Sequence, residues 1–517
     1  MAEKSLTKKQ EFATSEFRGM NTQALRQAIA DGQQSWLENI QPIGNANART
    51  VPAMSAVLAA LPGAPVPYIA MGFNIIISGT PTDILMIATT NGNLYQFNCQ
   101  TNAVTTIATS GNYTRASFAQ WKNQRVMIID AVSGLWDWNG TALTSAAVYP
   151  HPAPSPGQHI ATFAGRVWIA SNRTITFSAP DQYDDFRTSA AGGSFILTDE
   201  TVHSSVQQLV SANNFLYIFG TSSVNVISDV RVVSGVTLFT NTNLSTGVGT
   251  PFPLSATVYG RAVFFASVTG FYALYGSSAQ KISNELDGLY PLISGLSSPA
   301  GLGSAPTISA GAVVINNILC LAFQFDYADP AQGITRPLLA VYFDNKWFVA
   351  SQGTNSGIGS LSLIADNDVS GENRLYGMDT SGNIYRLFAD ASEAVPYRWQ
   401  TAFWDFGAPV LLKQAVKAGI GVYFSSQTAS LVINLDTENS TNAFTVAGGN
   451  QLQFIGTGPI TFVGTLPIAW IAGGYVLLQT DVTNIGRYLG MTMTGNAIDA
   501  TFTLALLEYN FRSQWGT

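Results

Sequence analysis

A short unit that recurs at nearly regular intervals constrains the fold of this chain more than any other feature of the sequence. Each unit is an apolar stretch, then a turn with a small polar residue and a glycine, then a strand rich in aromatic residues. The turn glycines are Gly92, Gly134, Gly270 and Gly382. Glycine suits these turns because it adopts positive φ without a steric penalty. Such a unit indicates the inner hairpin of a propeller blade.

The spacing of the units predicts a β-propeller. Gly92 and Gly134 are 42 residues apart, and weaker copies of the unit occupy residues 165–177, 214–227 and 338–348. A period of about 40 to 50 residues, with four short strands in each repeat, is typical of propellers. We therefore expect six or seven blades, the sixth of them enlarged by residues 326–336. An array of β-sandwiches is the alternative, but sandwiches repeat a turn and an aromatic strand less regularly.

The chain as a whole is expected to be all-β and to have three parts. Residues 1–60 are interpreted as an extended N-terminal arm, in which 21–31 are compatible with a short helix. Residues 61–395 are assigned to the propeller, and residues 396–517 to a closing domain, an antiparallel β-sandwich. Clusters of Gly and Asn separate the strands expected in this last part, which are 431–435, 451–455, 461–463, 475–479 and 502–511.

The composition excludes several classes of protein. Charged residues make up 11% of the chain, whereas an ordinary soluble domain has about 25%. The formal net charge of −7 provides no basic footprint for binding phosphates. Prolines interrupt the longest uncharged apolar stretch, residues 51–77, so we expect no membrane span. A neutral, polar surface of this kind is typical of β-rich assembly proteins.

No histidine or cysteine motif predicts a metal or cofactor site. His151, His159 and His203 do not have the spacing of metal ligands, and the proline-rich loop around the first two predicts exposed side chains. Cys99 and Cys320 lie far apart, so we expect two buried free thiols.

The acidic residues predict no catalytic site either. Asp184 and Asp185 are adjacent, and neighbours on a strand point to opposite faces. Asp366, Asp368 and Glu372 have a spacing similar to that of a calcium loop, but the glycine is displaced and the glutamate comes too early. The chain is therefore predicted to be no enzyme, with no catalytic residues and no cofactor.

Two segments outside the repeats resemble tail proteins of short-tailed bacteriophages. The first has the spacing F-x-G-x-N, W-x-x-N and R-x-x-P within residues 16–21, 36–40 and 44–52. The second, residues 399–407, is similar to the strand that leaves the propeller for the closing domain in that family. Together they cover about a tenth of the chain and flank the repeats in the same order as in the family.

The resemblance implies a tail nozzle or hub, also described as a packaged-DNA stabilisation protein. Such a protein forms a homo-oligomeric, hexameric ring below the adaptor (the head-to-tail connector) and extends the DNA channel. Its other partners are the tail spike or fibre and the plug or needle proteins. Genomic DNA passes through the lumen without specific binding, and the ring helps to retain and then eject the genome. The resemblance further implies a location in the virion tail, after assembly in the host cytoplasm.

In this interpretation the arm reaches a neighbouring subunit or the adaptor. Phe17, Trp36 and Leu37 are its expected anchors, because buried aromatic and apolar side chains dominate such contacts.

Two alternative functions stay open at this point. One is a tail-fibre or adhesion scaffold without a channel. The other is a propeller that binds or cleaves host-surface glycans through its exposed aromatic residues, for which the candidates are Trp136, Trp138, Trp168 and Trp347. Aromatic residues on propeller strands belong more often to the core.

Overall fold

The computed structural model describes residues 9–197, 205–275, 278–330, 332–352, 361–424, 431–446 and 474–512, and strands account for most of them. The described chain forms two compact units. One, here called the two-sheet unit, comprises residues 1–54, 340–356 and 388–517, and the other, the propeller unit, comprises 55–339 and 357–387. The boundaries expected at residues 60 and 395 lie near two positions, 54/55 and 387/388, at which the chain passes from one unit to the other. Residues 340–356, expected in the propeller, belong to the two-sheet unit.

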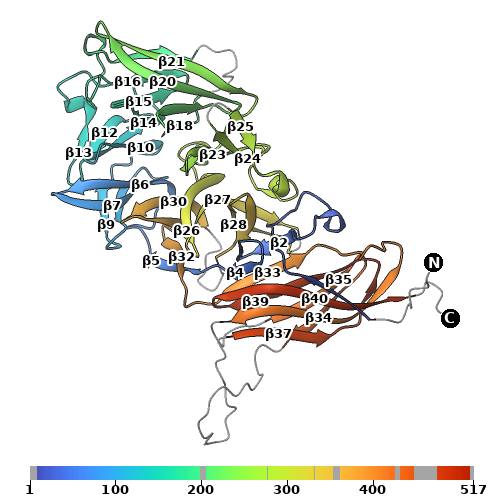
Figure 1. Cartoon of the computed structure of the whole chain (residues 1–517). Coiled ribbons are helices and arrows are strands. Elements are labelled where there is room, and N and C mark those ends of the chain that lie inside the picture. Colours follow the sequence, from blue (N-terminus) through green and yellow to red (C-terminus); the bar gives the residue numbers. More distant parts are fainter. Residues whose placement is uncertain are drawn as a thin grey trace, which may run out of the picture. The chain divides into compact units, whose positions relative to one another are not determined.

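Six four-stranded sheets form blades among the described residues of the propeller unit (Figure 1). The first blade has β6 (Pro67–Ile77), β7 (Thr80–Thr89), β8 (Leu94–Asn98) and β9 (Val104–Ala108). The second has β10 (Ala116–Trp121), β11 (Arg125–Asp130), β12 (Gly134–Trp138) and β13 (Leu143–Ser145). The third has β14 (His159–Phe163), β15 (Arg166–Ser171), β16 (Thr174–Phe177) and β17 (Gly193–Ile196).

The remaining sheets continue in chain order. The fourth blade has β18 (Gln208–Ala212), β19 (Phe215–Phe219), β20 (Ser223–Val233) and β21 (Val236–Thr246). The fifth has β22 (Thr257–Tyr259), β23 (Ala262–Ser267), β24 (Gly270–Tyr275) and β25 (Ser278–Lys281). The last blade combines β30 (Leu361–Val369), β31 (Glu372–Asp379) and β32 (Ile384–Asp390) with β5 (Ala53–Leu58), a strand from much earlier in the chain.

The blades follow one another around a ring. β6 contacts β10, β10 contacts β14, and β14 contacts β18. The strands β26 (Ile308–Ile315), β27 (Ile318–Asp329) and β28 (Ile334–Phe343) come between the fifth and last blades, because β26 contacts both β22 and β30. β30 in turn contacts β6 and closes the ring. The predicted all-β propeller of six or seven blades is therefore confirmed.

The propeller core lies between neighbouring blades, so each blade buries both of its faces. Ile84 and Met86 of β7 pack into the cluster shared with the second blade, whereas Leu85 and Ile87 pack into the cluster shared with the last blade. Successive side chains of a strand point to opposite faces. This double burial explains why the apolar stretches before the turns are continuous and do not alternate with polar residues.

The two-sheet unit combines strands from distant parts of the chain. One sheet has the order β3 (Ile40–Ile43), β4 (Asn47–Thr50), β40 (Ala500–Arg512), β34 (Leu412–Phe424) and β37 (Gly474–Asp481), with β1 (Gln10–Thr14) paired to β40 and β38 (Ile485–Gly486) to β34. The other has β29 (Lys346–Ala350), β2 (Gln34–Glu38), β33 (Val395–Thr401), β39 (Leu489–Ala497), β35 (Leu431–Thr437) and β36 (Thr441–Val446). Rings from both sheets pack together, as Tyr397 and Phe502 do at 5.1 Å.

Several expectations about this unit need correction or lie outside the description. The helix considered for residues 21–31 is a single 3-10 turn, η1 (Arg26–Ala28). Among the described residues the other 3-10 turns, all in the propeller unit, are η2 (Ala146–Val148), η3 (Thr188–Ala190), η4 (Asn284–Leu286) and η5 (Tyr290–Leu292). The strands expected at 451–455 and 461–463 lie outside the described residues. Within the described ranges, none of the helices has the length and apolar character needed to cross a membrane.

Candidate functional site

The residues predicted to anchor the arm on a neighbouring subunit are buried within their own chain. Phe17 and Leu37 are 0% exposed and Trp36 is 8% exposed. The ring of Phe17 lies 4.9 Å from that of Trp399, and the Trp36 indole donates a hydrogen bond to Glu38. The expectation that these side chains bind a partner is thus corrected, because the same apolar surface is already covered inside the two-sheet unit.

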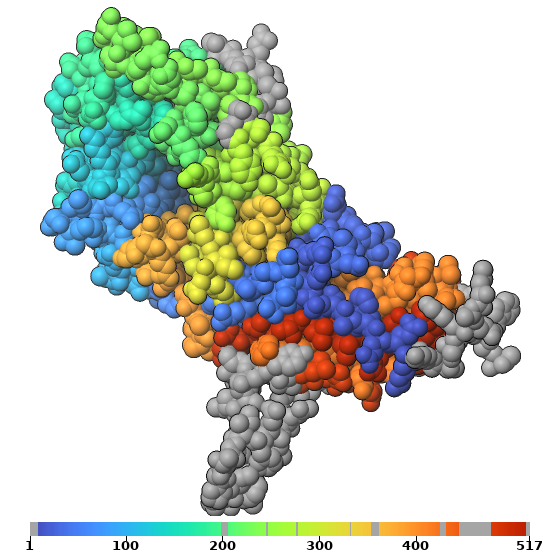
Figure 2. Space-filling model, in the orientation of Figure 1, coloured from blue at the N-terminus to red at the C-terminus, as the bar shows by residue number. Residues whose placement is uncertain are grey.

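The arm carries these residues because it supplies an interior strand. β2 pairs with β33 on one side and β29 on the other. β1 pairs with the edge of β40, and the β3–β4 hairpin joins the same sheet. Figure 2 shows the dark blue residues of the arm against the orange and red residues of the same unit.

Two residues of the arm, Gly19 and Asn39, occupy backbone positions that few residue types can adopt. Gly19 has φ of +99°, and a Cβ at this position would lie 3.2 Å from the backbone nitrogen of Trp347. Asn39 has φ of 57°. Its side-chain amide donates to the carbonyl of Pro396 at 2.7 Å, and its carbonyl oxygen accepts the N–H of Ser351 at 2.9 Å. Asparagine tolerates the left-handed conformation and satisfies neighbouring backbone groups.

Arg26 connects the arm to strands from the C-terminal part of the chain. Its guanidinium lies 2.6 Å from the Asp436 carboxylate, and both side chains are mostly buried. It also donates to the carbonyls of Thr401 and Met491, at 2.7 and 3.1 Å. Burial lowers the pKa of Arg26, and the neighbouring Asp436 opposes this shift. Removing one partner of such a pair leaves a buried charge without compensation. This contact therefore holds the arm in place within the folded unit.

The histidine positions differ from the sequence-based expectation in one case. His159 was expected on an exposed loop, but it begins β14 and is 7% exposed. Burial lowers the pKa of His159 to about 4. The imidazole of His151 lies 3.6 Å from Asp185 and is partly exposed. His203 lies outside the described residues.

The acidic pairs do not converge on a common point in the described structure. Asp185 is held by the guanidinium of Arg187, with bonds of 3.0 and 2.8 Å. The acidic residues compared with a calcium loop lie on a regular hairpin, where Asp366 faces Leu375 and Asp368 faces Asn373. Among the described residues, no group of three potential ligands could hold a metal ion.

The tryptophans considered as a glycan platform are mostly core residues. Trp138 is 5% exposed, Trp168 is 0% exposed and Trp347 is 1% exposed. Trp136 is partly buried and packs edge-on against Tyr113. Both cysteines are free and buried, and burial raises the pKa of Cys99 to about 11 and that of Cys320 to about 12.

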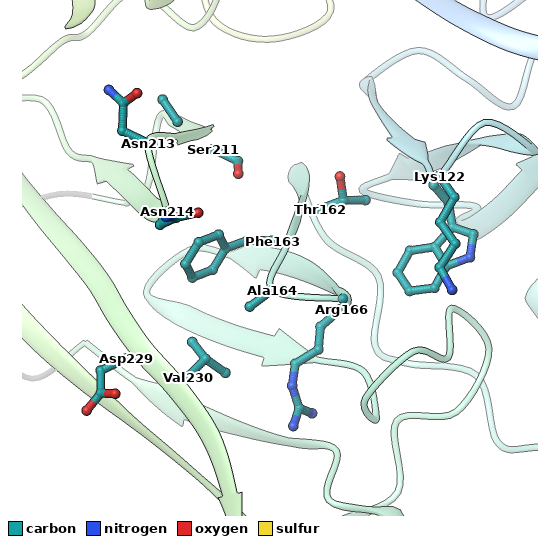
Figure 3. Close-up of a pocket in the computed structure, with 13 residues that line it drawn as sticks. Lys122, Thr162, Phe163, Ala164, Arg166, Ser211, Asn213, Asn214, Asp229 and Val230 are labelled. Atoms are coloured by element: carbon teal, nitrogen blue, oxygen red, sulfur yellow. The ribbon is translucent and has the colours of Figure 1, made fainter. Parts of the chain in front are cut away.

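A pocket that sequence reasoning missed lies where turns of three successive blades meet (Figure 3). Its volume is about 590 Å³. The β10–β11 turn contributes Lys122, the β14–β15 turn contributes Ala164 and Gly165, and the β18–β19 turn contributes Asn213 and Asn214. All five residues have positive φ. The β14–β15 and β18–β19 turns have two residues each, and such turns between twisted strands require positive φ. The Ala-Gly and Asn-Asn pairs, at matching places in consecutive repeats, could have identified these turns from the sequence.

The charged residues of this pocket already have partners. Lys122 lies 3.5 Å from the Asp181 carboxylate, and Asp229 pairs with Arg231. Arg166 is 2% exposed, and its guanidinium donates to two backbone carbonyls at 2.6 and 2.8 Å. The Lys122–Asp181 and Arg231–Asp229 pairs are balanced in charge, so the buried Arg166 leaves the pocket wall with one net positive charge.

Solved structures with low sequence identity are similar to about two thirds of this chain. No protein-family model and no curated protein sequence matches the chain. A chain in the S. cerevisiae complex of a Dbp5 variant with Nup159, a Gle1 variant, IP6 and ADP has a TM-score of 0.37 and 10% identity, over 68% of this chain and 98% of that one. A chain of YCF48 bound to D1 peptide has a TM-score of 0.38 and 12% identity, over 66% of this chain and 98% of that one.

Proposed function

We propose that this chain is a non-enzymatic structural subunit of a virus particle, the nozzle or hub at the tip of a short bacteriophage tail. One observation carries the proposal. The two segments that resemble this family lie near opposite ends of the chain, at residues 16–52 and 399–407, yet residues of both pack together. Trp399 of the second segment packs against Phe17 of the first, and its indole donates to Gln34 of the arm at 2.8 Å.

The contacts in this element give a physical reason for the shared spacing. Gly19 and Asn39 stand at backbone positions where most side chains would be strained, and Arg49 pairs with Asp499, the residue before β40. Residue types that suit such backbone geometry indicate that the arm and the closing sheets have the same fold as in the family they resemble. In this proposal the resemblance therefore reflects structure and not a shared catalytic site.

The proposed assembly is a closed hexameric ring built from head-to-tail contacts between identical chains. It would lie below the adaptor in the virion tail and contact the tail spike or fibre and the plug or needle proteins. Genomic DNA would pass through its lumen. Because the arm is occupied within its own unit, the contacts between subunits would use other surfaces than Phe17, Trp36 and Leu37.

Electron microscopy and mass photometry of the purified full chain test the ring. We expect particles of six times the mass of one chain, either alone or after addition of the adaptor from the same phage. The tail-fibre alternative predicts trimeric or other elongated particles without a lumen. A chain that remains monomeric with and without the adaptor would contradict the nozzle proposal.

A further inference from the structure

The pocket between the second, third and fourth blades has a chemistry that the nozzle role does not use. Four uncharged polar side chains line it, and one of them, Asn213, already donates to the carbonyl of Arg261 at 2.6 Å. The other three are Thr162 near the end of β14, Ser211 near the end of β18, and Asn214 in the turn that follows. None of the three donates or accepts a side-chain hydrogen bond with another described residue. Phe163 lies among them and presents an aromatic ring (Figure 3).

We propose that this pocket binds a neutral oligosaccharide. A ligand with many hydroxyl groups can both donate to and accept from the Thr162 and Ser211 hydroxyls and the Asn214 amide. An aromatic ring such as Phe163 supplies an apolar face for the C–H surface of a sugar ring. Pockets that combine a few placed polar groups with an aromatic wall are typical ligand sites.

The pairing of the charged residues favours a neutral ligand over a charged one. A polyanion would need free cations, but Lys122 faces Asp181, and Arg166 is buried with its guanidinium on backbone carbonyls. A polycation would have to displace Arg231 from Asp229. In either case an existing interaction would be lost before a new one formed. A neutral polar ligand leaves all of them in place.

The position of the pocket on rigid turns favours binding without rearrangement. Phe163 and Arg166 are directly paired across a two-residue turn, and so are Ala212 and Phe215. Phe163 also packs against Trp168, with ring centroids 6.3 Å apart. The backbone that carries the pocket residues is thus fixed by regular strand pairing, which reduces the entropy lost on binding.

Titration of the full chain with maltohexaose, cellohexaose and chitohexaose tests the proposal, with hexagalacturonate as the anionic counterpart. Calorimetry and saturation-transfer NMR would detect binding. We expect at least one neutral hexasaccharide to bind, with an affinity that does not change with salt concentration because no ion pair is formed. Failure of all three neutral probes to bind, or tighter binding of hexagalacturonate, would overturn the proposal.

Two substitutions connect binding to the pocket. Phe163→Leu removes the aromatic face but keeps an apolar side chain, and Asn214→Gly removes the amide but keeps the positive φ. Each should weaken binding about tenfold. Asn102→Gly is the matched control, since Asn102 is also an exposed turn residue with positive φ (58°) but lies in the first blade. Unchanged binding by both pocket variants would place the sugar elsewhere. Ring formation is measured separately and does not depend on this result.

Discussion

At the scale of single residues, buried aspartates explain why a polar turn recurs in the repeats. Asp130 ends β11 and is 0% exposed; its carboxylate accepts the N–H groups of Val132 and Ser133 at 2.8 and 2.9 Å. Asp379 ends β31 and accepts the N–H groups of Ser381 and Asn383 in the same way. These bonds satisfy backbone donors that a tight turn leaves without ladder partners.

The turn glycines of two repeats should differ in their tolerance of alanine. Gly134 has φ of +79° and open space around it, so Gly134→Ala should lower the free energy of unfolding by about 1 kcal/mol, the cost of the left-handed conformation. At Gly92 a Cβ would also lie 2.3 Å from the carbonyl oxygen of Gly111. Gly92→Ala should therefore cost about 2 to 4 kcal/mol. Urea unfolding of both variants measures the difference, and equal losses would contradict the close backbone approach.

His159 should make stability depend on pH. Burial holds its pKa at about 4 in the folded chain, whereas the unfolded chain has a histidine pKa of about 6.5. The unfolded state then binds more protons between these values, so stability is full above about pH 6.5 and falls as the pH is lowered towards 4. The slope from this group approaches about 1.4 kcal/mol per pH unit.

Urea unfolding at a series of pH values compares the wild-type chain with His159→Asn. The stability difference between the two should be constant above pH 7 and should shift in favour of the variant as the pH falls towards 4. Parallel curves over the whole range would show that His159 is not buried in its neutral form.

At the scale of elements, the arm is an integral part of a sheet. β2 is an interior strand, so its removal would expose the hydrogen-bonding edges of both β29 and β33. β1 adds only one ladder at an edge, where Phe12 packs on Trp404 with ring centroids 4.8 Å apart. The two strands of the arm therefore differ greatly in what their loss would cost.

Two truncations test this difference. Deletion of residues 1–14 removes β1 and should lower the melting temperature by a few degrees. Deletion of residues 1–38 also removes β2 and Arg26, and should abolish folding of the two-sheet unit. Circular dichroism melts and limited proteolysis measure both effects, with the propeller unit, residues 55–339 and 357–387, expected to resist digestion. A chain beginning at residue 39 that resists protease over 388–517 would contradict the assignment.

At the scale of the whole molecule, charge is scarce and partly hidden. The chain has 24 Lys and Arg against 31 Asp and Glu. Lys413 and Arg166 are 0% and 2% exposed, and both donate to backbone carbonyls. Lys346 is buried too and donates to Asn45 at 2.8 Å. These cations cannot neutralise phosphates at the surface.

The whole chain should bind duplex DNA poorly. Affinity for DNA grows with the number of phosphates neutralised, and each one adds to the salt dependence. Fluorescence polarisation with a labelled duplex at physiological salt should show little binding, and raising the salt should change little. Tight binding with a steep loss of affinity in higher salt would reveal a basic surface and would argue against a channel through which DNA slides freely.

The propeller could be predicted from the sequence because the residues that determine each repeat lie close together in the sequence. Each repeat contains its own turn residues and a continuous apolar strand such as residues 84–88, and both follow from backbone sterics and double burial. The approximate number of blades followed from the period alone. The buried state of Cys99 and Cys320 was also predictable, since two isolated thiols in a long apolar chain have few alternatives.

The role of the arm and the position of the pocket depended on contacts between distant residues. An apolar side chain such as Phe17 or Trp36 looks the same in the sequence whether it anchors a partner or fills a core. Only the pairing of β2 with β29 and β33 decided between these possibilities. His159 follows a proline-rich loop, yet β14 buries it. The pocket arises because turns about 40 to 50 residues apart in sequence meet in space. Local propensity determines strands and turns, but burial is a property of the neighbours that tertiary structure brings together.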